Sequence, residues 1–246
     1  MWTFSEVAPP LVPTVPQTNP NPINLYPVFP SEQVSLSSPP ALLQVARDTI
    51  AHDASWGQDN AFAEVFPAAA RVNAPGWVDQ FVEQLAARMT PNGVVVAGGG
   101  GMEVVGATEA VNSALLSSHE AFMRLFPAWQ QDAAFTRLRA KGAFLVNATR
   151  VGGEVQSPIE VESDVGGNAT FMSPWVEGVG GVVVTDAQGR AVPVHWRVPA
   201  RNTLRVFSFE THAGASYRIE RKRDAAECPH SPCATIADDG CQPNCT

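Results

Sequence analysis

Charged residues are few in this sequence, and basic residues are scarcest near its beginning. Charged residues make up 16% of the 246 residues, and Asp plus Glu (24) outnumber Lys plus Arg (16). The first basic residue is Arg47, and the first lysine is Lys141. A net charge of −8 is the opposite of the basic surface that nucleic-acid binding requires. We therefore expect no nucleic-acid partner.

Long apolar runs and a basic targeting segment are also missing. No apolar run approaches the roughly 20 residues of a membrane-spanning helix. The first 30 residues carry one charge, Glu6, so there is no positively charged start of a signal peptide. We expect no membrane partner, and the hydrophobic content of 45% predicts a packed core.

Cysteine is absent until residue 228, and four cysteines then follow within 19 residues. Their spacing, C-x4-C-x7-C-x3-C, differs from the C-x2-C pairs that are typical of zinc sites. The pattern favours two disulfides, with a zinc site as the alternative, and disulfides would indicate an oxidising, secreted or lumenal compartment. Three N-x-T triplets, at Asn147, Asn168 and Asn244, agree with that compartment, although localisation stays open. The candidate disulfide cysteines are Cys228, Cys233, Cys241 and Cys245.

Proline divides the chain into a lead-in and a folded remainder. Residues 1–30 hold eight of the 21 prolines, which excludes regular helix and central strand there. We expect four regions: an extended lead-in at 1–30, a helical region at 31–131, a β region at 132–223 and a cysteine-rich tail at 224–246.

Apolar spacing in the helical region predicts four helices. The first begins with Ser38 as N-cap and Pro39 as its first residue. A short helix at 61–72 and a third at 73–88 follow, the third with an apolar stripe that starts at Trp77. The fourth begins after a glycine run and continues to Phe122, about five turns.

Alternation and turn residues predict antiparallel strands in the β region. Phe144, Val146 and Ala148 alternate with more polar residues, and Gly152-Gly153 is typical of a hairpin turn. Short strands with Gly-rich turns favour an antiparallel β-sandwich. The expected fold class is therefore α+β. The further predicted strands lie at 155–163, 168–173, 181–186, 191–198, 203–210 and 215–221.

Four consecutive glycines, Gly98 to Gly101, stand before the fourth helix, and the first ionisable side chain after them is Glu103. Glycine is costly to order, so such a run indicates left-handed turns or a close approach to the backbone. A carboxylate in the first turn of a helix is stabilised by the helix dipole, which makes Glu103 the candidate catalytic residue. The alternative is that Glu103 only caps the helix. A phosphate loop is excluded because the G-x-x-x-x-G-K-[ST] lysine is missing.

Aromatic and amide side chains in the loops near the glycine run are of the kinds that bind a sugar. An indole can stack on the flat C–H face of a sugar ring, while amides and carboxylates bind hydroxyls. Core packing and helix capping are the equally weighted alternative. The candidate substrate-binding residues are Trp56, Gln58, Asn60, Gly100, Gly101 and Trp129.

Six segments, taken in order, resemble the C-terminal third of glycoside hydrolase family 95-like proteins, the α-L-fucosidase group. The resemblance covers about residues 24–150 and becomes weak in the β region. The segments are Leu25-Tyr-Pro-Val-Phe-Pro30, Phe66-Pro-Ala-Ala-Ala-Arg71, Gly98-Gly-Gly-Gly-Met-Glu103, Leu115-Leu-Ser-Ser-His-Glu120, Arg124-Leu-Phe-Pro-Ala-Trp129 and Leu138-Arg-Ala-Lys-Gly-Ala-Phe-Leu-Val146.

The resemblance implies a twelve-helix (α/α)6 barrel followed by a β domain, and hydrolysis of glycosidic bonds with inversion by an acid–base carboxyl pair. The position of the family's base aspartate falls on Met102, beside Glu103, and Glu103 is expected to take the role of base. The family's general acid lies upstream, so we expect the chain to be a C-terminal fragment with little activity alone. Carbohydrate is the implied partner, and no cofactor or metal is implied. A non-catalytic carbohydrate-binding or structural remnant is the alternative.

Overall fold

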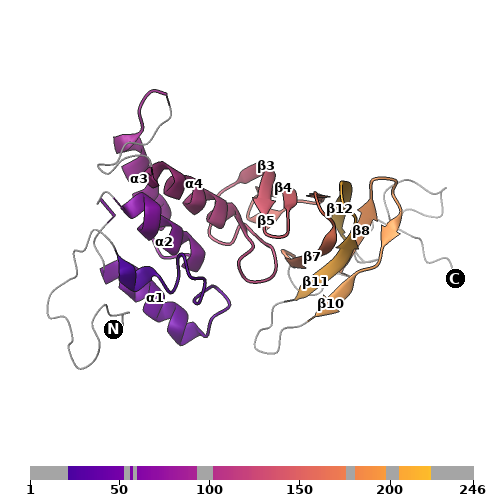
Figure 1. Cartoon of the computed structure of the whole chain (residues 1–246), viewed down its shortest axis with the longest axis horizontal. Coiled ribbons are helices and arrows are strands. Elements are labelled where there is room, and N and C mark those ends of the chain that lie inside the picture. Colours follow the sequence, from indigo (N-terminus) through magenta and orange to yellow (C-terminus); the bar gives the residue numbers. More distant parts are fainter. Residues whose placement is uncertain are drawn as a thin grey trace. The chain divides into compact units, whose positions relative to one another are not determined.

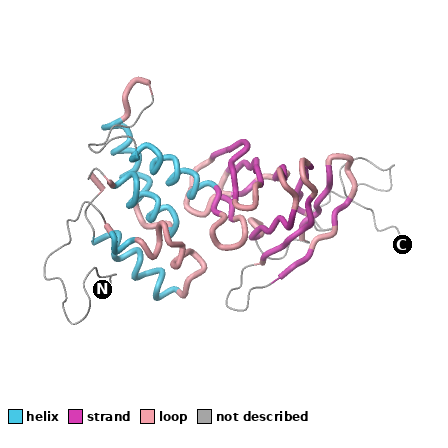
Figure 2. Tube along the Cα trace, in the orientation of Figure 1, coloured by secondary structure: helices cyan, strands magenta, loops and turns pink. Residues whose placement is uncertain are grey.

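A computed structural model of the chain describes residues 22–52, 56–57, 60–92, 102–175, 181–197 and 205–222. The chain divides into two compact units, Met1–Gln130 and Gln131–Thr246, which we call the helical unit and the sheet unit (Figure 1). Helices occupy the first unit, and all strands but two belong to the second (Figure 2). All paired strands are antiparallel, which confirms the α+β class. None of the described helices is long and apolar enough to cross a membrane.

The described residues of the helical unit form four α-helices, two short helical segments and one small hairpin. The hairpin pairs Leu116 with Leu125 and Ser117 with Arg124. The elements are η1 (Ile23–Leu25), α1 (Pro40–His52), the π-helix η2 (Ala61–Val65), α2 (Phe66–Val72), α3 (Trp77–Arg88), α4 (Met102–Leu115), β1 (Leu116–Ser117) and β2 (Arg124–Leu125).

The core of this unit is formed by aromatic rings and alanines. Phe62, Phe66 and Phe81 lie with ring centroids 5.0 to 5.8 Å apart, within the range of favourable aromatic pairs. Every side chain of α2 is buried, and α4 packs on both α2 and η2. Small residues on both partners, Ala68 to Ala70 on α2 and Ala107, Ala110 and Ala114 on α4, are buried in this core.

Helix boundaries differ from the predictions at three places. Asn73 adopts a left-handed conformation (φ 47°) and ends α2, so the third helix begins at Trp77 instead of residue 73. The fourth helix ends at Leu115, because the following residues form the β1–β2 hairpin and the Phe126 N–H donates to the Leu115 carbonyl (2.7 Å). The first helix starts at Pro40, and the Ser38 hydroxyl accepts a hydrogen bond from the Ser35 N–H (3.0 Å).

In the sheet unit the described residues form ten strands in two sheets. One sheet has seven strands in the order β3-β4-β6-β12-β8-β9, with β5 also paired to β4, and the other has the order β10-β11-β7. The strands are β3 (Ala133–Ala140), β4 (Phe144–Val151), β5 (Glu154–Val155), β6 (Ile159–Ser163), β7 (Gly167–Met172), β8 (Val182–Asp186), β9 (Ala191–Val192), β10 (His195–Arg197), β11 (Val206–Thr211) and β12 (Ala215–Arg221).

Two predicted strands are each divided by a proline. Pro158 separates β5 from β6, and Pro193 separates β9 from β10, which pair in different sheets. Proline has no N–H to donate to a ladder, so a strand is interrupted there. Strand β3 has no counterpart among the predicted strands. The alternation at 144–149 falls within β4, and the predictions at 168–173, 181–186 and 215–221 match observed strands to within one or two residues.

Side chains of the two sheets contact each other. The rings of Phe209 on β11 and Tyr217 on β12 have centroids 5.5 Å apart, and the Thr211 hydroxyl donates to the Ser163 hydroxyl on β6 (2.9 Å). These residues are buried, with Ser163 and Phe209 fully so. These buried contacts join the two sheets within the sheet unit.

Gly106 is the position at which we expect a single methyl group to disrupt the helical unit. A Cβ there would lie 1.9 Å from the Phe62 carbonyl oxygen and 2.4 Å from the Ala63 Cα. Alanine normally favours a helix over glycine by about 1 kcal/mol, but backbone atoms cannot move aside as a side chain can. We expect Gly106→Ala to lower the free energy of unfolding by about 3 kcal/mol or more, measured by urea denaturation.

Gly57→Ala is the matched control, because the nearest atom to a Cβ there is the Gln84 side-chain oxygen at 3.9 Å. Its effect should stay within about 0.5 kcal/mol. Equal stability of Gly106→Ala and the unchanged chain would show that α4 does not sit against η2 in this way.

Candidate functional site

Helix α4 carries the candidate base, Glu103, in its first turn. The structure describes the backbone of this residue, and its side chain lies outside the description, as do Gln58, Gly100, Gly101 and the four cysteines. The contacts that hold α4 in place therefore define the candidate site.

The first contact is between backbones. Gly106, three residues after Glu103, lies against the Phe62–Ala63 peptide of η2 so closely that no Cβ would fit. This contact fixes how α4 lies against η2 in the turn that follows the start of the helix. A π-helix such as η2 is rare in proteins as a whole, and those that occur are often found at functional sites.

The second contact is a buried guanidinium. Arg71, the last residue of the segment Phe66–Arg71, donates from Nη2 to Glu109 Oε1 on α4 (2.9 Å). Its guanidinium also lies 4.7 Å from the ring centroid of Phe29 and 3.6 Å from a carboxylate oxygen of Glu32. The Arg71 side chain is only 9% exposed, so its charge depends on these partners.

The third contact holds the C-terminal end of α4. The last carbonyls of a helix have no partner within the helix. Here the Phe126 N–H donates to the Leu115 carbonyl (2.7 Å), and the Ala128 N–H donates to the Ala114 carbonyl (3.3 Å). The segment 124–129 therefore ends the helix by hydrogen bonds to it.

A buried ion pair holds that segment in turn. Glu120 and Arg124 pair at 2.8 Å with side chains 5% and 10% exposed. Glu120 Oε1 also accepts from the Ser35 hydroxyl (2.8 Å) and the Ser37 N–H (3.0 Å). Burial on its own would raise the pKa of Glu120, but Arg124 and these hydrogen bonds outweigh it, so the pKa lies below the ordinary value.

Trp56 lines a pocket of about 350 Å³ in the helical unit. Its ring also packs on Phe66, with centroids 5.2 Å apart, so it belongs to the core edge as well as to the pocket. The polar lining comes from α1 and α3, with Gln44 Nε2 donating to Asp48 Oδ1 (2.8 Å). Other polar lining groups are those of Arg47 and Gln80.

The remaining described candidates do not line this pocket. Asn60 precedes η2, and its carbonyl accepts the Glu64 N–H (3.1 Å). Trp129 packs against the helical core, and its buried indole N–H makes no hydrogen bond with any described residue. The pocket residues Gln44 and Asp48 were missed from the sequence, where their i, i+4 spacing on one helix face was the available signal.

Among the carboxyl groups in the described part of the chain, Glu64 of η2 has a pKa above its ordinary value. Burial is the cause, and the hydrogen bond from the Tyr26 hydroxyl to Glu64 Oε1 (3.3 Å) opposes it only in part. Its other carboxyl oxygen is buried without a hydrogen bond among the described residues. No three His, Cys, Asp or Glu side chains gather into a metal site in the described part of the chain.

No protein-family model matches the chain, and no curated protein matches its sequence.

Glu120 and Glu64 predict opposite pH dependences of stability. The folded-state pKa of Glu120 is lowered, so its contribution is present above about pH 4.5 and is lost as the pH falls through the folded pKa. We expect Glu120→Gln to cost about 3 kcal/mol at pH 7, because it leaves the Arg124 charge buried without its partner. This deficit should shrink steadily below pH 4.5 in urea denaturation at several pH values.

Glu64→Gln is the matched control of opposite sign. The folded-state pKa of Glu64 is raised, so the chain loses stability as the pH rises from 4.5 through that pKa. The glutamine variant does not titrate and should gain stability relative to the unchanged chain over that interval. The same pH dependence for both variants would contradict the two assigned environments.

Proposed function

We propose that the chain is the C-terminal part of an inverting glycoside hydrolase that resembles family 95 α-L-fucosidases, with Glu103 as the general base. The helices would then be a portion of an (α/α)6 barrel, and the two contacting sheets of the second unit would be its C-terminal β-sandwich. The substrate class is carbohydrate, and no metal or cofactor takes part.

The observation that carries this proposal is the contact of the resembling segments with one another and with α4. Arg71, from one segment, stacks on Phe29 of another and bonds to α4. Glu120 and Arg124 join two further segments, and Phe126 ends the helix. Segments about 100 residues apart in the sequence therefore hold the helix that carries Glu103 in its first turn.

A fixed helix suits the chemistry of a general base. In an inverting hydrolase the base removes a proton from water on the face opposite the leaving group, so the carboxylate must keep its position while water fills the gap. Its place in the first turn of α4 favours the ionised form, because the helix dipole stabilises an anion there. Trp56 and its neighbouring amide and carboxylate groups supply a stacking face and hydroxyl ligands in the same unit.

A glycosyl fluoride tests the base independently of a general acid, because fluoride leaves without protonation. We expect the chain to release fluoride from α-L-fucosyl fluoride slowly, with β-L-fucose as the first product by NMR. Glu103→Gln should lower this rate by at least about 10²-fold. The nitrophenyl α-L-fucoside should react far more slowly than the fluoride, because its leaving group depends more on acid assistance. α-L-Galactosyl fluoride, which differs from the fucosyl fluoride only in carrying a hydroxyl at C6, tests whether the site selects fucose.

Glu83→Gln is the control, since Glu83 is an exposed carboxylate on α3 and its removal should leave the rate unchanged. Fluoride release no faster than in buffer, or equal rates for Glu103→Gln and the unchanged chain, would refute the catalytic proposal. Saturable fucose binding without turnover would instead favour the alternative, a non-catalytic carbohydrate-binding module, for which the Trp56 pocket is the supporting observation.

A further inference from the structure

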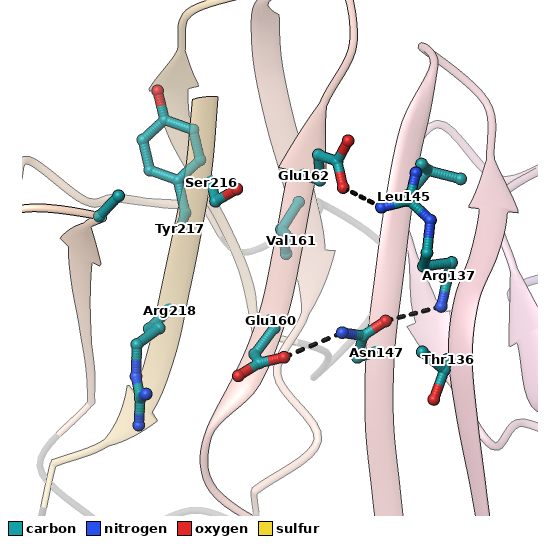
Figure 3. Close-up of a pocket in the computed structure, with 11 residues that line it drawn as sticks. Thr136, Arg137, Leu145, Asn147, Glu160, Val161, Glu162, Ser216, Tyr217 and Arg218 are labelled. Carbon is teal, nitrogen blue, oxygen red and sulfur yellow. Dashed lines mark hydrogen bonds and ion pairs between the residues drawn. The ribbon is translucent and has the colours of Figure 1, made fainter. Parts of the chain in front are cut away.

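The outward face of the seven-stranded sheet carries a pocket of about 370 Å³ (Figure 3). This volume lies within the range of small-molecule sites, about 300 to 1,000 Å³. Strands β3, β4, β6 and β12 and the turn after β8 supply its walls. The lining side chains used below are Arg137, Leu145, Asn147, Glu160, Glu162 and Arg218.

The strand register arranges these side chains in two neighbouring rows across the sheet. Asn147 is opposite Glu160, which is opposite Arg218. Leu145 is opposite Glu162, which is opposite Ser216. One row therefore runs amide, carboxylate and guanidinium, and the row beside it contains a second carboxylate between a leucine and a serine.

A β-bulge adds the fourth charged group. The register of β3 against β4 shifts between Phe135 and Leu138, and Arg137 within the shift has φ 55°. A non-glycine residue in this region costs about 1 kcal/mol or more. Bulges redirect side chains and are frequent beside active sites. Here the redirected Arg137 guanidinium reaches past β4 to pair with Glu162 on β6.

Mutual hydrogen bonds hold these polar groups in place before any ligand arrives. The Arg137 N–H donates to Asn147 Oδ1 (2.6 Å), and Asn147 Nδ2 donates to Glu160 Oε2 (2.9 Å). Figure 3 shows this chain of contacts from β3 to β6. Groups ordered in this way lose little conformational entropy when a ligand binds.

The row of hydrogen bonds from Asn147 to Glu160 does not continue to Arg218. Glu160 and Arg218 are opposite in register, yet no ion pair joins these two described residues. Arg218 Nη2 instead lies 3.5 Å from Glu220 on its own strand. In Figure 3 the Arg218 guanidinium lies apart from the Glu160 carboxylate. Glu160 and Arg218 therefore offer the pocket an acceptor and a donor that are not paired with each other.

We infer that this pocket binds a neutral carbohydrate. Its formal charges cancel, two carboxylates against two guanidiniums, which disfavours a strongly charged ligand. Each sugar hydroxyl donates and accepts at once, so one ring can donate to Glu160 and accept from Arg218. Carbohydrate as the ligand class rests in part on the proposed glycosidase function. The pocket itself lies wholly in the sheet unit and does not use Glu103.

Titration of the ¹⁵N-labelled full chain with 2′-fucosyllactose and with cellotriose tests this site. We expect saturable shifts of backbone amides on β4, β6 and β12, and at least tenfold weaker binding in Arg218→Met. Arg197→Met is the matched control, because Arg197 is an exposed arginine of the other sheet, and it should bind as the unchanged chain does.

Arg137→Gly separates binding from stability. Glycine accepts the positive φ without strain, so the sheet should keep its stability. Sugar binding should weaken at least tenfold, because the ion pair that holds Glu162 beside the pocket is lost. No saturable shift with either sugar, or equal affinity for Arg218→Met, would overturn the inference.

Glu103→Gln distinguishes the two proposals. It should lower fluoride release by at least about 10²-fold and leave these shifts unchanged, whereas Arg218→Met should weaken sugar binding at least tenfold and leave fluoride release unchanged. Loss of sugar binding in Glu103→Gln would place the sugar in the helical unit and would also overturn the sheet pocket.

Discussion

The contact between Gly106 and the Phe62–Ala63 peptide is the constraint on which the helical unit depends. Two backbones meet there with no side chain between them, so α4 can approach η2 only if its own residue is glycine. The alanines beside it, Ala107 and Ala110, continue the close approach. This contact lies one turn after Glu103, so the start of α4 is positioned by backbone atoms, which are harder to displace than side chains.

Polar contacts complete this constraint along the rest of α4. Close packing of small residues is tolerant of sliding along the helix axis, but a hydrogen bond is not. Arg71 fixes the middle of the helix through Glu109, and Phe126 fixes its end through the Leu115 carbonyl. Because Arg71 is buried with a charge, its partners cannot be lost singly without a large cost. Several of the segments that carry the family resemblance are distant from one another in the sequence. In the structure they share one role, which is to hold α4 in place.

The sequence alone predicted elements well where the pattern is local and poorly where it is not. Alternation gave β4 and β12, and helical spacing gave α1 and α4. The apolar pattern after Leu115 continued as if helical, because a two-residue strand pair such as β1 with β2 leaves no periodicity to detect. Trp56 lines a pocket and also packs against the core, whereas Trp129 packs against the core and does not line that pocket, and a tryptophan beside a loop is compatible with either outcome.

The sheet pocket shows why sites of this kind are not visible in a sequence. Glu160 and Glu162 could be read as outward residues of one strand from their spacing of two. Their partners depend on register and on a bulge: Arg137 meets Glu162 only because β3 shifts by the bulge and its backbone turns to a positive φ. Without that shift the two rows would hold one guanidinium fewer, and the carboxylates would leave a net negative face. The strained residue is therefore what balances the formal charge of the pocket, and this balance is the support for proposing a hydroxyl-rich ligand over an ion.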